Sequence, residues 1–237
     1  MPVDFISDKI YKVDYTAWKK EISKMSIFGS AEIQKIYLDN WMEILKAQDS
    51  FACRDYNNPK IKMLMLKEKM EAPENFQIPV NYETNSMFIH FRVSRIIQMI
   101  EQSGGSLDTA TNIHIKEFTN KNTRINWTPT TDKVKIKTQP IIIVPLTVGR
   151  FYQWLVIDGN HRVTHAIAER EKSVKAFSLD PNVLIAGNLF NTGFDKFLYI
   201  FQNEMIALAS YIQREGYSDE EAIKLAYFCS GKVQFYA

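Results

Sequence analysis

The sequence predicts an α+β fold, in which a small mixed β-sheet is wrapped by N- and C-terminal α-helices. Two short apolar runs in the middle of the chain, Pro140–Leu146 and Phe151–Ile157, are typical of buried strands. On both sides of them, apolar residues recur at three- and four-residue steps, which is the spacing of an amphipathic helix. The 237 residues, 46% of them hydrophobic, are enough to build a substantial core.

Two helices are predicted in the N-terminal part of the chain. Ser30–Gln48 shows helical apolar spacing, with Ser30 as its N-cap. Met87–Gln102 has the same character and ends at Ser103-Gly104-Gly105, which tolerates left-handed backbone. His90 falls in this second helix, where we weigh a packed or exposed role about four to one over a ligand role.

The central strands are expected to form a hairpin through a turn at Thr147–Arg150. The second strand ends abruptly in the polar segment Asp158-Gly159-Asn160-His161-Arg162. Val163, Ala166 and Ile167 then fall at helical spacing, which predicts a helix over His161–Arg170. Val174–Leu179 supplies a last strand of the core.

The polar segment after the second strand is the strongest candidate for chemistry. The first turn of a helix has N–H groups without intrahelical partners and carries partial positive charge, so anions bind there. Gly159 allows close backbone approach, and Arg162 suits paired contacts with phosphate oxygens. Asp158 and His161 are the residue types that hold a metal ion or move a proton. A purely structural turn, with Asp158 as a helix cap, has about half the weight on residue types alone.

The motifs in this region resemble those of the ParB/sulfiredoxin superfamily. Gln139-Pro140-Ile141-Ile142-Ile143-Val144 is similar to its first hairpin strand. Leu155 to Arg162, followed by Ala166, is similar to its second strand, glycine turn and helix. The resemblance covers about residues 111–182 and implies a core of the ParB/sulfiredoxin type.

The resemblance implies a nucleotide site for ATP, ADP or CTP with Mg²⁺. The phosphates would lie over the turn at Gly159, Asn160, His161 and Arg162. Asp158 and His161 would be the catalytic residues, and Asp158 would also be a metal ligand. Asn160 stands where sulfiredoxins have their reactive cysteine, so repair of oxidised cysteine by that route is not expected.

Contacts with nucleic acid are a separate expectation. Asn120–Pro129 resembles a diverged form of an upstream superfamily box, with Arg124 as a candidate contact. Lys133, Lys135 and Lys137 alternate with apolar residues, so a strand there would place three ammonium groups on one face, suited to a phosphate backbone. We favour a solvated edge strand over DNA contact by about two to one. The net charge of +2 argues against extensive nucleic-acid contact.

The C-terminal part is predicted to be helical. Asp195–Arg214 carries a broad apolar surface that must meet the core or another subunit, so an oligomer through the C-terminal helices is one expectation. Ser218-Asp219-Glu220-Glu221 is a capping-box pattern that opens a helix over Ala222–Cys229. The three carboxylates at that helix start would repel phosphate. We therefore interpret this region as packing and not as a DNA-reading element.

Three regions follow from these patterns: a mainly helical region at 1–110, the core at 111–182, and a helical region at 183–237 packed on that core. Polar, turn-forming residues at 72–75 and 79–86 predict linkers. The sequence shows neither a signal peptide nor an apolar run of the roughly 20 residues that a bilayer requires, so a cytoplasmic protein without membrane association is expected. Cys53 and Cys229 are expected to be buried free thiols, with a disulfide given about one chance in ten.

Three functions follow, in order of preference. The first is a nucleotide-binding enzyme, an Mg²⁺-dependent phosphotransferase or NTP hydrolase that uses the turn at 158–162. The alternative is a DNA-associated regulatory or partition-like module that binds nucleotide with little or no turnover. The third is a ParB-like nuclease, although the sequence shows no paired carboxylates specific to two-metal cleavage.

Overall fold

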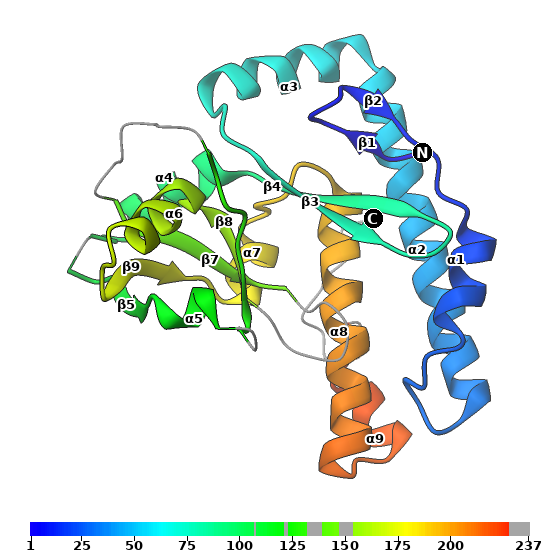
Figure 1. Cartoon of the computed structure of the whole chain (residues 1–237). Coiled ribbons are helices and arrows are strands. Elements are labelled where there is room, and N and C mark those ends of the chain that lie inside the picture. The colour runs from blue at the N-terminus through cyan, green and yellow to red at the C-terminus, as the bar shows by residue number, and fades with distance from the viewer. Residues whose placement is uncertain (107, 121–122, 132–138, 147–153, 228–237) are drawn as a thin grey trace. The chain divides into compact units, whose positions relative to one another are not determined.

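The computed structural model describes the whole chain except residues 107, 121–122, 132–138, 147–153 and 228–237 (Figure 1). The fold is α+β, as the sequence predicts. The chain divides into two compact units, described separately below. Unit 1 comprises Met1–Leu66, Gln77–His90 and Asn191–Ala237, and unit 2 comprises Lys67–Phe76 and Phe91–Phe190. The boundaries that the sequence suggests, at 110 and 182, do not coincide with those of the two units.

Unit 1 is built on two long helices that run side by side (Figure 1). Its elements are β1 (Val3–Asp4), β2 (Lys9–Ile10), α1 (Tyr15–Ile22), α2 (Ala31–Asn57), α8 (Gly193–Glu215) and α9 (Asp219–Lys224). It also contains α3 (Pro59–Glu71) up to Leu66 and all but one residue each of β3 (Phe76–Asn81) and β4 (Ser86–Phe91). The core between α1, α2 and α8 is aromatic: the Phe201 ring lies 5.2 Å from that of Trp41 and 5.7 Å from that of Trp18. All three side chains are almost fully buried, and such ring pairs add to the free energy gained from burial alone.

Three helix ends predicted in unit 1 are confirmed, but α2 runs past the predicted end at Gln48, and α9 ends at Lys224 instead of continuing to Cys229. Ser30 caps α2 by accepting a hydrogen bond from the Ile33 amide, although the helix continues to Asn57. Gly216 ends α8 in the left-handed conformation, with φ 75°. The Ser218–Glu221 capping box opens α9, as its pattern indicates.

The prediction of one helix over Met87–Gln102 is wrong. Ser86–Phe91 forms strand β4, which pairs with β3 (Phe76–Asn81), and helix α4 begins only at Val93 and ends at Gln102. The prediction of a linker at 79–86 is wrong in part, because β3 includes Pro79. Met87, Ile89 and Phe91 alternate as in a strand, and all three are completely buried. This burial favours a strand even though the apolar residues also fit helical spacing.

Unit 2 contains a mixed five-stranded sheet with the order β5-β9-β7-β8-β6. Its elements after α4 are β5 (Thr111–His114), α5 (Lys116–Thr119), β6 (Ile125–Asn126), β7 (Ile141–Pro145), β8 (Trp154–Asp158), α6 (Asn160–Ala168), β9 (Ser173–Ser178) and α7 (Pro181–Ala186). The central pair β7 and β8 is antiparallel, and β9 runs parallel to β7. The predicted strands, the turn and the following helix are therefore present, and the expected hairpin turn at 147–150 lies outside the described residues.

The two faces of this sheet differ in what covers them. Ile141, Ile143 and Val156 pack in one buried cluster with Val163 and Ala166 of α6. Ile142, the residue between the two isoleucines of β7, lies against the other face, which also borders α4. Helix α6 is thus fixed on one face, and its first residue directly follows the turn after β8.

Helix α3 (Pro59–Glu71) has no buried residue. No helix in the described part of the chain is long and apolar enough to cross a membrane. Cys53 is a half-buried free thiol, where full burial was expected, and Cys229 lies in the segment left undescribed.

Candidate functional site

The turn between β8 and α6 requires glycine. Gly159 has φ 96° and ψ 19°, a left-handed conformation that residues with a Cβ rarely adopt. A Cβ at this position would also meet Ile141 Cγ2 at 2.5 Å and Arg162 Nε at 2.9 Å. Protein atoms therefore fill the space that we expected a ligand to use, and Gly159 acts through the geometry of the turn.

Arg162 clamps the start of β7 to the end of β8. Its Nη2 donates to Asp158 Oδ2 at 2.6 Å, and its Nη1 donates to the carbonyl of Pro140 at 2.7 Å and to that of Gln139. The Arg162 side chain is 12% exposed and that of Asp158 is 25% exposed. The guanidinium is thus directed at protein acceptors, and its positive charge is held beside the turn.

Asn160 also binds protein groups. Its Oδ1 accepts a hydrogen bond from the Thr128 amide at 2.8 Å, and its Nδ2 donates to the Val156 carbonyl at 3.4 Å. One turn later, the Thr164 hydroxyl accepts from the Thr130 amide at 3.1 Å. The side chains of α6 therefore hold the segment 128–130 along the start of this helix.

His161 differs from its neighbours at the turn. Its ring is half-buried, and its Nδ1 is a buried atom that has no hydrogen-bond partner among the residues described here. No side chain caps the N-terminus of α6, and its first turn contains no acidic residue. The first N–H groups of a helix lack intrahelical acceptors, so His161 lies where anions bind most readily.

A cavity of about 150 Å³ in unit 2 lies beside the residues that Arg162 binds. Asp158, Gln139 and Pro140, the three residues that Arg162 binds, all line it. The rest of the lining includes Ile97, Ile100, Glu101, Gly105, Ser106, Ile142 and Phe177. Its walls are mainly apolar, and its two charged residues, Glu101 and Asp158, are both carboxylates, so it does not resemble an anion site.

The other predicted contacts are only partly described. Arg124 is exposed, and its carbonyl accepts from the Trp154 amide where β6 meets β8. Lys133, Lys135 and Lys137 lie outside the described residues. In the described part of the chain, no group of three His, Cys, Asp or Glu residues is arranged to hold a metal ion. Asp158 is the carboxylate at the turn itself, and one of its oxygens is already bound to Arg162.

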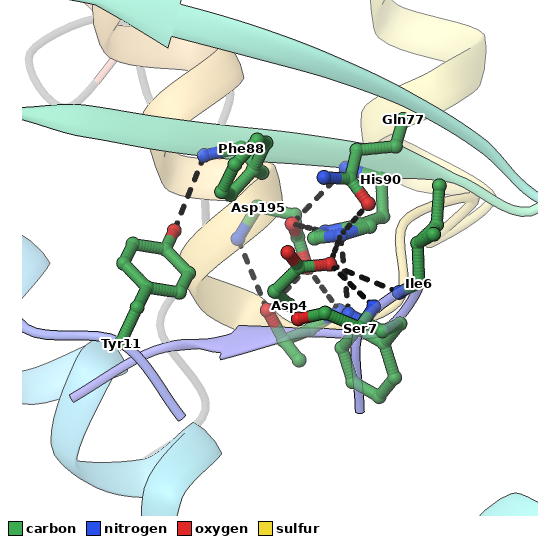
Figure 2. A network of polar contacts seen from close by, with 10 residues as sticks. Asp4, Ile6, Ser7, Tyr11, Gln77, Phe88, His90 and Asp195 are labelled. Carbon is green, nitrogen blue, oxygen red and sulfur yellow. Dashed lines mark hydrogen bonds and ion pairs between the residues drawn. The ribbon is translucent and has the colours of Figure 1, made fainter. Parts of the chain in front are cut away.

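A second polar cluster, in unit 1, was not predicted (Figure 2). His90 is fully buried on β4, and its Nδ1 lies 2.6 Å from Asp195 Oδ1 at the start of α8. Its Nε2 lies 3.1 Å from Gln77 Oε1 and accepts from the Phe5 amide. With both ring nitrogens occupied and no exposed surface, His90 has a structural role. The sequence gives one signal for it, the Thr192–Asp195 capping box that fixes the carboxylate.

Comparisons with known proteins do not extend this account: no protein-family model, curated protein or solved structure matches the chain.

Proposed function

We propose that unit 2 binds a nucleotide, ATP, ADP or CTP with Mg²⁺, with the phosphates at the N-terminus of α6. The observation that carries the proposal is the environment of His161. A buried ring nitrogen without a partner among the described residues lies beside an uncapped helix start. An unpaired buried polar atom is costly, and a phosphate oxygen would relieve that cost while accepting from the first N–H groups of the helix.

The neighbouring side chains have supporting roles in this proposal. Arg162 adds positive charge from a fixed position, because Asp158 and two carbonyls already hold its guanidinium. Asn160 keeps the segment at 128–130 in place beside the helix. When Mg²⁺ arrives with the nucleotide, Asp158 is the residue at the turn that would contact it, and the ion would neutralise phosphate charge.

The pairing of Asp158 with Arg162 favours binding over rapid turnover. Asp158 Oδ2 already accepts a hydrogen bond from the Arg162 guanidinium at 2.6 Å, so this oxygen is occupied and not free to take a proton from an attacking water. We therefore infer a nucleotide-binding module with little or no hydrolysis, in which His161 binds phosphate and is not a general acid.

The test is thermal unfolding of the full chain with ATP, ADP, CTP or GTP, each with and without Mg²⁺, because a ligand of the native state raises the Tm by mass action. At least one nucleotide should raise the Tm of the wild-type protein. His161→Asn should abolish the shift and His165→Asn, at the other end of the same helix, should retain it. Equal shifts in both variants, or none for any nucleotide, would exclude the proposed site.

Turnover is measured separately, as phosphate released from the nucleotide that binds. We expect no release above the rate without protein. Rapid release that Asp158→Asn abolishes would instead assign catalysis to this turn, and the hydrolase would replace the binding module.

A further inference from the structure

Helix α3 presents an apolar stripe that nothing in the described chain covers. Met63, Leu66 and Met70 are 67%, 54% and 84% exposed. They follow one another at steps of four or three residues, so they lie along a single face of the helix. The residues on the opposite face, Ile61 and Met65, are half-buried.

The stripe has the register of a coiled-coil seam. When Met63 is assigned to heptad position a, Leu66 occupies d and Met70 occupies the next a. Pro59 then falls at the preceding d, at the first residue of the helix. A seam of this kind is narrower than the apolar face by which a helix packs on a globular core.

The lysines of α3 occupy all the positions that flank this seam. Lys60 and Lys67 fall at e, and Lys62 and Lys69 fall at g. Two of them also make weak contacts within the chain: Lys62 lies over the Tyr56 ring at 4.2 Å, and Lys67 Nζ is 3.9 Å from Glu71. No acidic residue stands at an e or g position of this helix.

Glu68, which faces away from the seam, is already paired. Glu68 occupies position f, and its carboxylate accepts from Arg95 Nε at 3.2 Å and forms an ion pair with Arg92. These contacts fix the orientation of the helix's second half within unit 2. They leave the seam exposed, with Lys60, Lys67 and Lys69 exposed beside it and Lys62 half-buried.

We propose that α3 is one half of a heterotypic coiled coil, whose other half is a partner helix with apolar residues at a and d and carboxylates at e and g. The lysines at e and g favour this acidic partner helix over the other candidates. A second copy of α3 would place lysine opposite lysine in either orientation, because residues at e and g face each other across a helix pair. A nucleic acid would contact the lysines, but its charged phosphates would then lie against the apolar side chains of the seam, which is unfavourable. A lipid surface requires a broad apolar face, which the two lysine rows do not leave.

The experiment measures binding of the full chain to a labelled synthetic helix of about three heptads, with Leu at a and d and Glu at e and g, by fluorescence anisotropy. We expect saturable binding that weakens as salt is raised, since three of the four flanking lysines are exposed. The same peptide with Lys at e and g should not bind. Reversal of two flanking charges, Lys67→Glu with Lys69→Glu, should weaken binding of the acidic peptide roughly tenfold.

Helix α3 itself supplies a matched control. Leu66→Asp places a charge in the seam and should abolish binding. Leu64→Asp makes the same change two residues away at position b, where the leucine is 66% exposed, and should leave binding intact. Both substitutions replace leucine by aspartate in the same helix and so have the same helix-propensity cost. A difference in binding between the two variants therefore cannot come from unfolding of the helix.

Four outcomes would overturn the proposal. They are equal loss of binding in the two leucine variants, no binding of the acidic peptide to the wild-type chain, self-association of the chain that Leu66→Asp abolishes, and adsorption to phosphatidylserine vesicles with no peptide binding. The proposal is independent of the nucleotide site, because none of these measurements uses a nucleotide.

Discussion

His90 in unit 1 and His161 in unit 2 show how burial and pairing separate a structural histidine from a candidate ligand. His90 has a partner on both ring nitrogens and no exposed surface. His161 is half-buried and has a buried Nδ1 without a hydrogen-bond partner among the described residues. Satisfied polar groups in a core stabilise one conformation, whereas an unsatisfied buried group needs an explanation, and a bound ligand is the one that we propose for His161.

The largest difference between the two histidines is expected in stability. His90→Leu removes the Nδ1 proton that the buried Asp195 accepts, so we expect a loss of about 3 kcal/mol in the free energy of unfolding. The buried carboxylate then keeps only neutral donors, the backbone amide of residue 90 and the amide and hydroxyl of Thr192. His161→Leu should cost less than about 1 kcal/mol, because Nδ1 has no hydrogen bond within the described chain to lose. Urea unfolding of the two variants measures both values. A cost for His161→Leu as large as that for His90→Leu would place His161 in the core.

The turn before His161 provides the next test. Gly159→Ala introduces a Cβ 2.5 Å from Ile141 Cγ2 at φ 96°, and we expect a cost of about 3 kcal/mol from strain and overpacking. Gly104→Ala is the matched control, because Gly104 has φ 80° but no atom within 4 Å of the new Cβ. It should cost about 1 kcal/mol, the conformational part alone. Equal costs in thermal or urea unfolding would mean that the space beside Gly159 is open, as a ligand cradle would require.

A smaller effect is expected for Glu204, another buried carboxylate of unit 1. Burial raises the pKa of this group, although the Tyr37 hydroxyl, the Trp41 indole N–H and the Tyr227 amide donate to it. A carboxyl pKa that is higher in the folded than in the unfolded chain lowers stability as pH rises from the unfolded value, near 4.5, through the folded value. Glu204→Gln should remove this part of the pH dependence, a difference on the order of 1 kcal/mol. Stability curves of wild-type and variant that remain parallel from pH 4 to pH 8 would contradict it.

Local patterns predicted the centre of unit 2 correctly. Strands β7 and β8, the glycine turn, α6 and β9 follow one another closely, and each has its own apolar period and end signals. The secondary structure of Met87–Phe91 could not be predicted from local spacing, because its apolar residues fit both the strand and the helix period. Burial against residues distant in the sequence determines that this segment is a strand. Helix α3 was not predicted for another reason. Its apolar residues lie on two opposite faces, so the sequence lacks the single apolar stripe by which an amphipathic helix is identified.

The candidate site was predictable in its location but not in its contacts. The polar run at 158–162 marked the turn, yet the sequence did not indicate that Arg162 binds the carbonyls of Gln139 and Pro140. Backbone acceptors carry no sequence signal. The partners of His90 come from segments that are distant in the chain, so pattern analysis could not bring them together.

The most direct test of the central claim is an amide NMR titration of the full chain with the nucleotide that raises its Tm. The account predicts that the largest shifts fall on the backbone amides of Asn160, His161 and Arg162, and that His161→Asn reduces them. Shifts confined to unit 1, or to the cavity lining around Ile97 and Phe177 with the α6 amides unchanged, would contradict a phosphate site at this helix start.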